Sequence, residues 1–159
     1  MEKENDYQLE NNVVEGNGFA RELSGNDVHF GPGAAGMVSS KGDMSIDRAV
    51  AVVAKTGQNL EVRNGGAWVM VAGGSMHIEN GGAEYMVIGG ETEIKNGGAL
   101  LMVAGKNVNI NRGGAGIIIS KQTTLMEGSR VLMNTPQALA FGAALGLVIA
   151  LVSWFLKKR

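Results

Sequence analysis

The hydrophobic and polar positions of this chain repeat every sixteen residues. Cutting the sequence from Gly33 gives six windows without a gap: GAAGMVSSKGDMSIDR, AVAVVAKTGQNLEVRN, GGAWVMVAGGSMHIEN, GGAEYMVIGGETEIKN, GGALLMVAGKNVNINR and GGAGIIISKQTTLMEG. We number the places in each window from one to sixteen; place three is always alanine, and place fourteen is always apolar. A more divergent copy, NGFARELSGNDVHFGP, begins at Asn17. A repeat of this length predicts one structural unit per window.

Each window predicts two short strands joined by corners. The first strand is an apolar run such as Val69–Val71, and the second alternates between polar and apolar residues, as in Ser75–Glu79. Asparagine and glycine tolerate positive φ, so the Asn-Gly-Gly phrase suits a corner. A phosphate-binding reading of this phrase would need a helix behind it, whereas a strand follows each copy. The corner residues are Asn64, Gly65, Asn80, Gly81, Asn96 and Gly97.

Sixteen residues are enough for one coil of a β-solenoid and too few for a strand, a helix and two turns. We therefore predict an all-β fold, a parallel β-solenoid of about seven coils over residues 17–128. Residues 1–16 are polar and are predicted to be disordered, and residues 129–136 are predicted to be a linker.

Charged residues at place fifteen alternate in sign from coil to coil. This register ladder consists of Asp47, Arg63, Glu79 and Lys95. Stacked coils bring neighbours in this column to one strand spacing, so that opposite charges favour the correct register. Each exposed pair contributes only about 0.2–1 kcal/mol, so the column specifies alignment more than it stabilises.

The first strand is apolar on both of its faces. We assign places three, five and seven to the core, for example Ala67, Val69 and Val71, although Lys55 at place seven argues against this choice. Places four, six and eight are then an apolar ribbon on the outside, which requires a cover. We predict a second copy of the chain as that cover; the alternatives are a strand twisted so that both sets are interior, and a membrane-lying face, which the lack of flanking Lys or Arg disfavours. The predicted interface residues are Val38, Val52, Trp68, Met70, Met86, Leu100, Met102 and Ile118.

The C-terminal segment predicts a single transmembrane helix. Residues 137–156, QALAFGAALGLVIALVSWFL, carry no charge and are followed by the basic tail 157–159. At 1.5 Å per residue, twenty residues match a hydrocarbon thickness of about 30 Å. Small residues recur every fourth position, which favours close helix packing in lipid: Ala138, Gly142, Gly146 and Ala150.

Two opposing signals in the sequence indicate the side of the membrane on which the solenoid lies. The polar N-terminal stretch has no apolar signal region, which predicts a cytoplasmic solenoid with a C-terminal tail anchor. The basic residues at 157–159 favour the opposite orientation, because positive charge prefers the cytoplasmic side. We give more weight to the missing signal.

Composition predicts no catalytic chemistry. The net charge of −1 gives no basic field for nucleic acid, and the absence of cysteine excludes disulfides and thiolate metal sites. His29 and His77 both fall at place thirteen, three coils or about 14 Å apart, too far to share a metal ion or a proton. We therefore predict a protein that is not an enzyme, with no catalytic residue, cofactor or metal.

A short-repeat β-solenoid joined to a membrane-seeking segment resembles the bactofilins, bacterial cytoskeletal proteins that polymerise from compact β-helices. The resemblance covers residues 17–128, concerns architecture alone and transfers no functional residue. It implies a structural protein that assembles at a membrane. The sequence thus predicts a membrane-anchored scaffold whose solenoids associate laterally. The alternative is a binding module that presents the ribbon, or a polar face with Glu61, His77 and Glu93, to another protein or a surface polymer.

Overall fold

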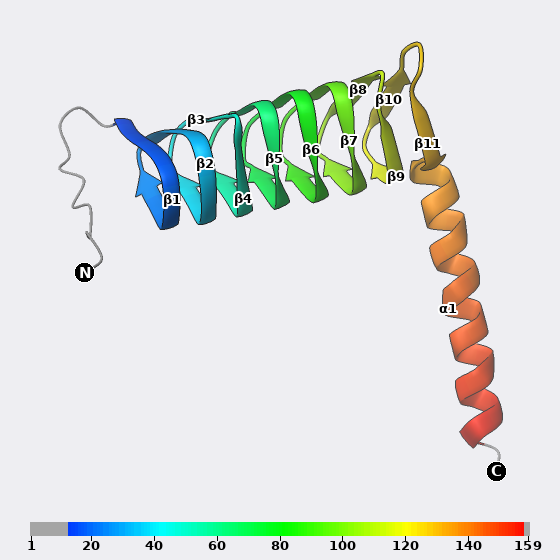
Figure 1. Ribbon diagram of the computed structural model, residues 1–159. Coiled ribbons are helices and arrows are strands. Elements are labelled where there is room, and N and C mark those ends of the chain that lie inside the picture. The colour runs from blue at the N-terminus through cyan, green and yellow to red at the C-terminus, as the bar shows by residue number, and fades with distance from the viewer. Residues whose placement is uncertain (1–12, 158–159) are drawn as a thin grey trace.

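The chain forms a rod of stacked β-coils with one helix projecting from its C-terminal end (Figure 1). The computed structural model describes the backbone of residues 13–157 and the side chains of residues 13–147. The parallel β-solenoid has about eight turns. Three predictions fall outside the described residues: the disorder of residues 1–12, the last two residues of the basic tail, and helix packing through the side chain of Ala150.

All eleven described strands belong to one parallel sheet that winds around the rod. They are β1 (Val13–Gly25), β2 (Asp27–Ser40), β3 (Met44–Asp47), β4 (Ala49–Thr56), β5 (Leu60–Ala72), β6 (Met76–Ile88), β7 (Thr92–Ala104), β8 (Asn107–Asn111), β9 (Gly114–Ile119), β10 (Gln122–Leu125) and β11 (Arg130–Met133), followed by α1 (Thr135–Lys157). In the central coils each residue pairs with the residue sixteen positions on, as Leu60 does with Met76 and Met76 with Thr92. The repeat period is therefore the length of one coil.

The two strands predicted for each window are joined differently from the prediction. The second strand of one window continues through the Asn-Gly-Gly corner into the first strand of the next, so that β5, β6 and β7 are each thirteen residues long. Pairing between β5 and β6 skips Asn64 and Trp68, which marks two bends within the strand. Each coil consequently has three runs: places twelve to fifteen, the corner to place four, and places five to eight.

The Asn-Gly-Gly corner combines a backbone conformation with close stacking. Asn64, Asn80 and Asn96 adopt left-handed φ values of 53°, 58° and 55°. Their side chains form a ladder in which each amide nitrogen donates to the asparagine oxygen of the preceding coil at 3.1 Å. The glycines that follow are needed for a different reason from the one predicted, since Gly81 and Gly97 do not have positive φ. A Cβ at Gly97 would overlap the carbonyl oxygen of Gly81, so glycine here permits the coils to approach.

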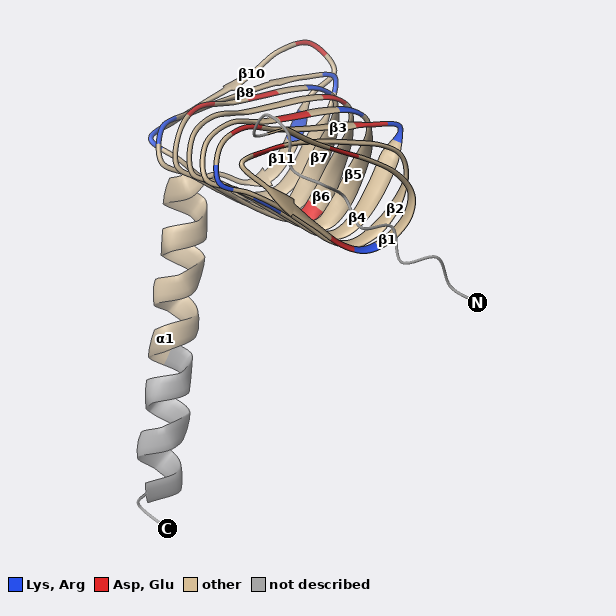
Figure 2. Cartoon of the chain, turned by 90° about the vertical axis from the view of Figure 1, so that its left-hand side faces the viewer, with Lys and Arg blue, Asp and Glu red and all other residues tan. Residues whose placement is uncertain are grey.

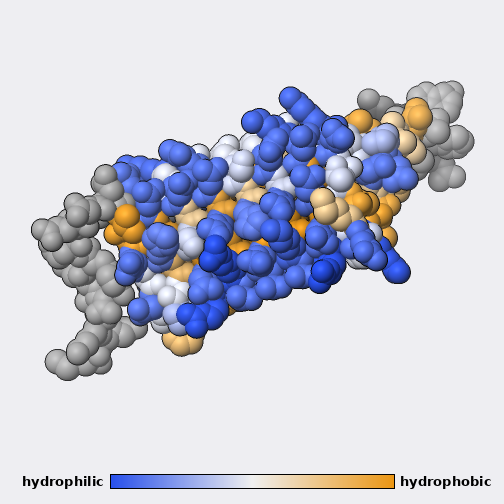
Figure 3. Space-filling view, turned by 90° about the horizontal axis from the view of Figure 1, so that it is seen from above, coloured by the Kyte–Doolittle hydropathy of each residue, from blue (hydrophilic) through white to orange (hydrophobic). Residues whose placement is uncertain are grey.

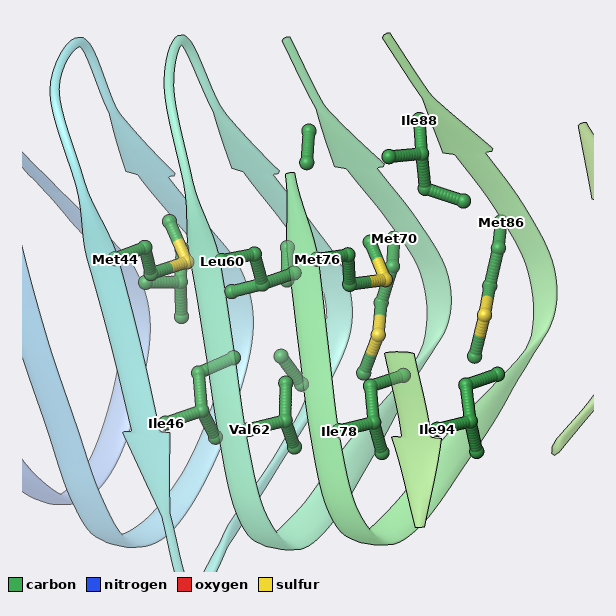
Figure 4. Packing of buried hydrophobic residues seen from close by; sticks show 14 of the residues in the cluster. Met44, Ile46, Leu60, Val62, Met70, Met76, Ile78, Met86, Ile88 and Ile94 are labelled. Atoms are coloured by element: carbon green, nitrogen blue, oxygen red, sulfur yellow. The ribbon is translucent and has the colours of Figure 1, made fainter. Parts of the chain in front are cut away.

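The core shows that our assignment of the first strand was wrong at places five and seven. Places three, six, eight, twelve and fourteen point inward, and place six is buried throughout: Val38, Ala54, Met70, Met86, Met102 and Ile118. The bend at place four explains the error, because it turns the chain so that places three and six both face inward. Lys55 at place seven is accordingly exposed. Figure 4 shows Met70, Met86 and Ile88 on one side of the core, facing Met76, Ile78 and Ile94 on the other.

The two ends of the rod depart from the regular repeat. The solenoid begins at Val13, so residues 13–16, predicted to be disordered, belong to β1. The first coil is shorter than the others: Gly18 pairs with Gly33 and Val13 with Asp27, with a register shift between Gly16 and Gly18. At the other end, the predicted linker 129–136 contains β11, which pairs in parallel with β9 and adds a further turn.

The start of α1 is fixed to the last coil. Asn134 and Gln137 form a reciprocal capping pair, in which the Gln137 backbone N–H donates to Asn134 Oδ1 and the Asn134 N–H donates to Gln137 Oε1, at 3.3 and 3.1 Å. The hydroxyl of Thr135 accepts from the Ser120 backbone N–H at 3.0 Å and donates to the Ser120 carbonyl at 3.1 Å. These bonds set the direction in which α1 leaves the rod.

Neighbouring side chains of β6 test the observed core. We expect Met86→Ala to lower the free energy of unfolding by about 2–5 kcal/mol, because Met86 is 1% exposed and its loss leaves a cavity. Val87→Ala is the matched control and should change the free energy by no more than about 0.5 kcal/mol, since Val87 faces outward. Chemical denaturation of the full chain in detergent, followed by circular dichroism, measures both. Equal effects of the two substitutions would contradict the observed parity.

Candidate functional site

A groove runs along the side of the rod that carries β3, β8 and β10. It has a volume of about 730 Å³ and follows places eleven to thirteen across successive coils. Between its rims lies the strand backbone at place twelve, where the side chains of Met44, Leu60 and Met76 point into the core. Figure 3 looks onto this side and shows a hydrophobic band between rows of hydrophilic side chains.

One rim of the groove is a structural column at place eleven. The backbone N–H of Asp43 donates to Asp27 Oδ1 at 2.8 Å, that of Asn59 to Asp43 Oδ1 at 2.9 Å, and that of Ser75 to Asn59 Oδ1 at 2.9 Å. Each of these side chains therefore supports the backbone of the following coil. Our sequence reasoning missed this column, although the run of short polar acceptors Asp27, Asp43, Asn59 and Ser75 at sixteen-residue intervals was a usable signal.

The other rim carries place thirteen, where Glu61, His77 and Glu93 are consecutive neighbours in the register. His77 Nδ1 lies 3.2 Å from Glu93 Oε2, and Lys95 Nζ lies 3.3 Å from Glu93 Oε1. His29 is separated from His77 by Ser45 and Glu61 in the same column. Among the described residues, no group of three or more His, Cys, Asp or Glu side chains could hold a metal ion. The rim therefore carries exposed groups that can donate and accept hydrogen bonds.

The register ladder is aligned as the sequence predicts, but its ion pairs are different. Asp47, Arg63, Glu79 and Lys95 are successive partners in the parallel register. Arg63, however, contacts Glu61 two residues earlier in its own strand at 2.6 Å, and Lys95 contacts Glu93 in the same way. Within residues 13–147, no ion pair joins neighbours of the column. Arg63 and Lys95 are thus paired along their own strands, because residues two positions apart lie on the same face of a strand.

Only three residues of the predicted solenoid interface are exposed. Val38, Met70, Met86, Met102 and Ile118 lie in the core at 0–1% exposure and cannot contact a partner; their assignment to an interface was wrong because of the bend at place four. Val52, Trp68 and Leu100, all at place four, are 53–58% exposed. With Val50 beside them they form a line of apolar side chains at the bend, which we call the ridge. Glu84 interrupts the ridge, and its carboxylate accepts a hydrogen bond from Trp68 Nε1.

A second apolar surface covers places five and seven of the four successive coils in which β5, β6, β7 and β9 end, next to the last turn, which contains β11. We call it the wall, and its members are Val69, Val71, Tyr85, Val87, Leu101, Val103, Ile117 and Ile119. Every one of them faces outward and is half-buried or exposed. No charged residue occurs among the eight, and Lys55 at place seven bounds the wall toward the N-terminus. The sequence signal for an apolar outer surface was therefore sound, while the residues assigned to it were mostly inward.

The described part of α1 has exposed apolar side chains, with Leu139, Phe141, Leu145 and Leu147 all 45–68% exposed. Ala138 is half-buried, and nothing lies within 4 Å of the position that a Cβ would take at Gly142 or Gly146. Among the residues that the structure describes, no helix meets the length and hydropathy needed to cross a membrane. Packing between helices through the small residues stays a prediction.

No family model, curated protein or solved structure matches this chain. The structure is compatible with the solenoid architecture that the resemblance to bactofilins implies, since the chain forms a parallel β-solenoid of about eight turns, but no match supports that family.

The core beneath the groove contains a polar atom without a partner, which generates a stability prediction. Thr92 occupies place twelve, and its buried hydroxyl makes no hydrogen bond. We expect Thr92→Val to raise the free energy of unfolding by about 1–2 kcal/mol, because an unpaired buried hydroxyl is costly. Thr56→Val is the matched control and should lower it by about 1 kcal/mol, since the Thr56 hydroxyl donates to the Gly42 carbonyl. The midpoints of chemical denaturation measure both changes. Destabilisation by Thr92→Val would show that the Thr92 hydroxyl makes a hydrogen bond.

Proposed function

We propose that this protein is a membrane-anchored structural rod that associates laterally with copies of itself. The C-terminal segment would hold the rod at a bilayer, and the ridge would join neighbouring rods. The observation that carries the proposal is the exposed apolar surface at places four, five and seven, which water alone does not satisfy.

Anchoring is supported by the sequence and by the position of the segment. Residues 137–156 contain no charge and lie within α1, which extends from the last coil with exposed apolar side chains in its described part. A helix with these residues would be poorly solvated in water and well solvated in lipid. The cytoplasmic location of the solenoid stays a prediction from the sequence.

Lateral association is supported by the ridge. Val50, Val52, Trp68 and Leu100 are large apolar side chains that are more than half exposed at one edge of the rod. Aromatic residues that become fully desolvated dominate the energy of protein interfaces, and Trp68 has its indole N–H already paired with Glu84. A symmetric dimer would bury the same ridge on both rods.

A binding module is the second candidate, favoured by the groove. Its volume of about 730 Å³ and its polar rim with Glu61, His77 and Glu93 could receive an extended polymer or a peptide. The two candidates differ in which surface is sensitive to substitution: the ridge for self-assembly, the groove rim for a binding module.

Anchoring is tested by a charge at the centre of the segment. We expect the full chain to float with phosphatidylcholine vesicles and to resist carbonate extraction. Leu147→Arg should markedly reduce the resistant fraction, because arginine at a helix centre costs about 2.5–3.5 kcal/mol in lipid. Leu139→Arg, near the end of the segment, is the matched control and should be milder, since arginine there can reach the interface. A wild-type chain that carbonate releases would contradict anchoring.

Self-assembly is tested by the mass of the full chain in a mild detergent. We expect an oligomer, and we expect the double substitution Trp68→Ser, Leu100→Ser to raise its dissociation constant by at least about 30-fold, which corresponds to about 2 kcal/mol. Leu125→Ser, an exposed apolar residue on β10, is the control and should leave the mass unchanged. A monomeric wild type, or an oligomer insensitive to the ridge substitutions, would contradict association through the ridge.

A further inference from the structure

The wall and α1 share one side of the rod. Places five to eight lie across the core from places twelve to fifteen, as Met70 and Ile88 lie across from Met76 and Ile78 in Figure 4. The outward residues of places five and seven therefore face away from the groove. Figures 1 and 2 show α1 running away from the side that carries β3, β8 and β10. The wall thus faces the same way as α1 runs.

The apolar character of this side changes along the rod. In the four coils that carry the wall, places five and seven are all apolar, from Val69 to Ile119. In the coils farther from α1 the same column contains Lys55, Ser39 and Ser24. Charge is therefore absent from places five and seven of these four coils, whereas Lys55 occupies the same column in the coil before them.

We propose that the wall rests on the lipid surface of the membrane that holds α1, so that the rod lies along the membrane. This inference rests on the proposed anchoring. With α1 inserted, the space beside the helix on its own side of the rod is the membrane. A second rod seated on the wall would occupy that space, so a bilayer fits this surface better than a second copy does.

Anchoring also removes the need for a basic surface. A free protein requires electrostatic attraction or a large apolar area to bind lipid stably. Here α1 is attached directly after β11, so that the wall is held next to the lipid at a high effective concentration. A modest uncharged patch is then sufficient to keep the wall in contact with the lipid. In this orientation the groove faces away from the membrane, and the ridge lies at the flank, where a neighbouring anchored rod can reach it.

The chain contains no cysteine, which permits single-site labelling without a background. The test uses the full chain with Val87→Cys, on the wall, labelled with an environment-sensitive nitrobenzoxadiazole dye and reconstituted in phosphatidylcholine vesicles. Glu91→Cys is the matched control, because Glu91 lies three residues after Ile88 in the same window but on the rim of the groove. Ile119→Cys provides a second wall position. Flotation and circular dichroism establish that each labelled chain is anchored and folded.

We expect the labels at residues 87 and 119 to show blue-shifted emission, strong quenching by nitroxide lipids and at least about fivefold weaker quenching by aqueous iodide than the label at residue 91. Equal iodide quenching at all three positions in vesicles that float would overturn the wall proposal and leave anchoring intact. Protection from iodide without quenching by nitroxide lipids would also overturn it, since a second copy would then cover the wall. A chain that does not float would refute anchoring and the inference together.

Discussion

The structure depends on the backbone hydrogen bonds between coils that are stacked in register. Each coil must place its N–H and C=O groups opposite those of the next, so every coil must follow the same path. At the Asn-Gly-Gly corner that path brings consecutive backbones so close that a Cβ at Gly81 would overlap the carbonyl oxygen of Gly65. The second glycine is restricted by the following coil, since a Cβ at Gly82 would overlap the carbonyl oxygen of Gly98. The repeated phrase is therefore required by stacking on both sides.

The sequence predicted the parts of the fold that this stacking controls. The sixteen-residue period, the parallel register, the inward alanine at place three and the inward residues at places twelve and fourteen all follow from columns of like residues. The bend at place four could not be predicted in the same way, because glycine occupies this place in only two windows, at Gly36 and Gly116, and the other four windows have Val52, Trp68, Glu84 and Leu100. One additional bend reverses the alternation, and it moved the methionines of place six from a supposed surface into the core. Lys55 was the one residue that indicated the correct parity.

The ends of the rod show how a repeat architecture limits its own growth. A solenoid exposes an unpaired strand edge at each end, which is an aggregation hazard. At the N-terminal end, the shortened first coil and its register shift between Gly16 and Gly18 disturb the edge of β1. At the C-terminal end, the short strands β10 and β11 replace the thirteen-residue strands of the middle, and the capped start of α1 is attached to the last turn. Both ends are irregular where a regular copy would invite another rod to continue the sheet.

The placement of single charges then determines how far each apolar surface extends. Lys55, which pairs with Val71, is the charged residue that ends the wall toward the N-terminus. The wall therefore spans four coils, a length of about 14–19 Å at the spacing of stacked strands. On the ridge, Glu84 falls between Trp68 and Leu100, but its carboxylate is engaged by the indole N–H, which lowers the cost of desolvating it. A charge that is paired within the rod is compatible with a protein interface, whereas an uncharged surface without such pairing suits lipid. The two apolar surfaces of this rod thus differ in the chemistry of the cover that each can accept.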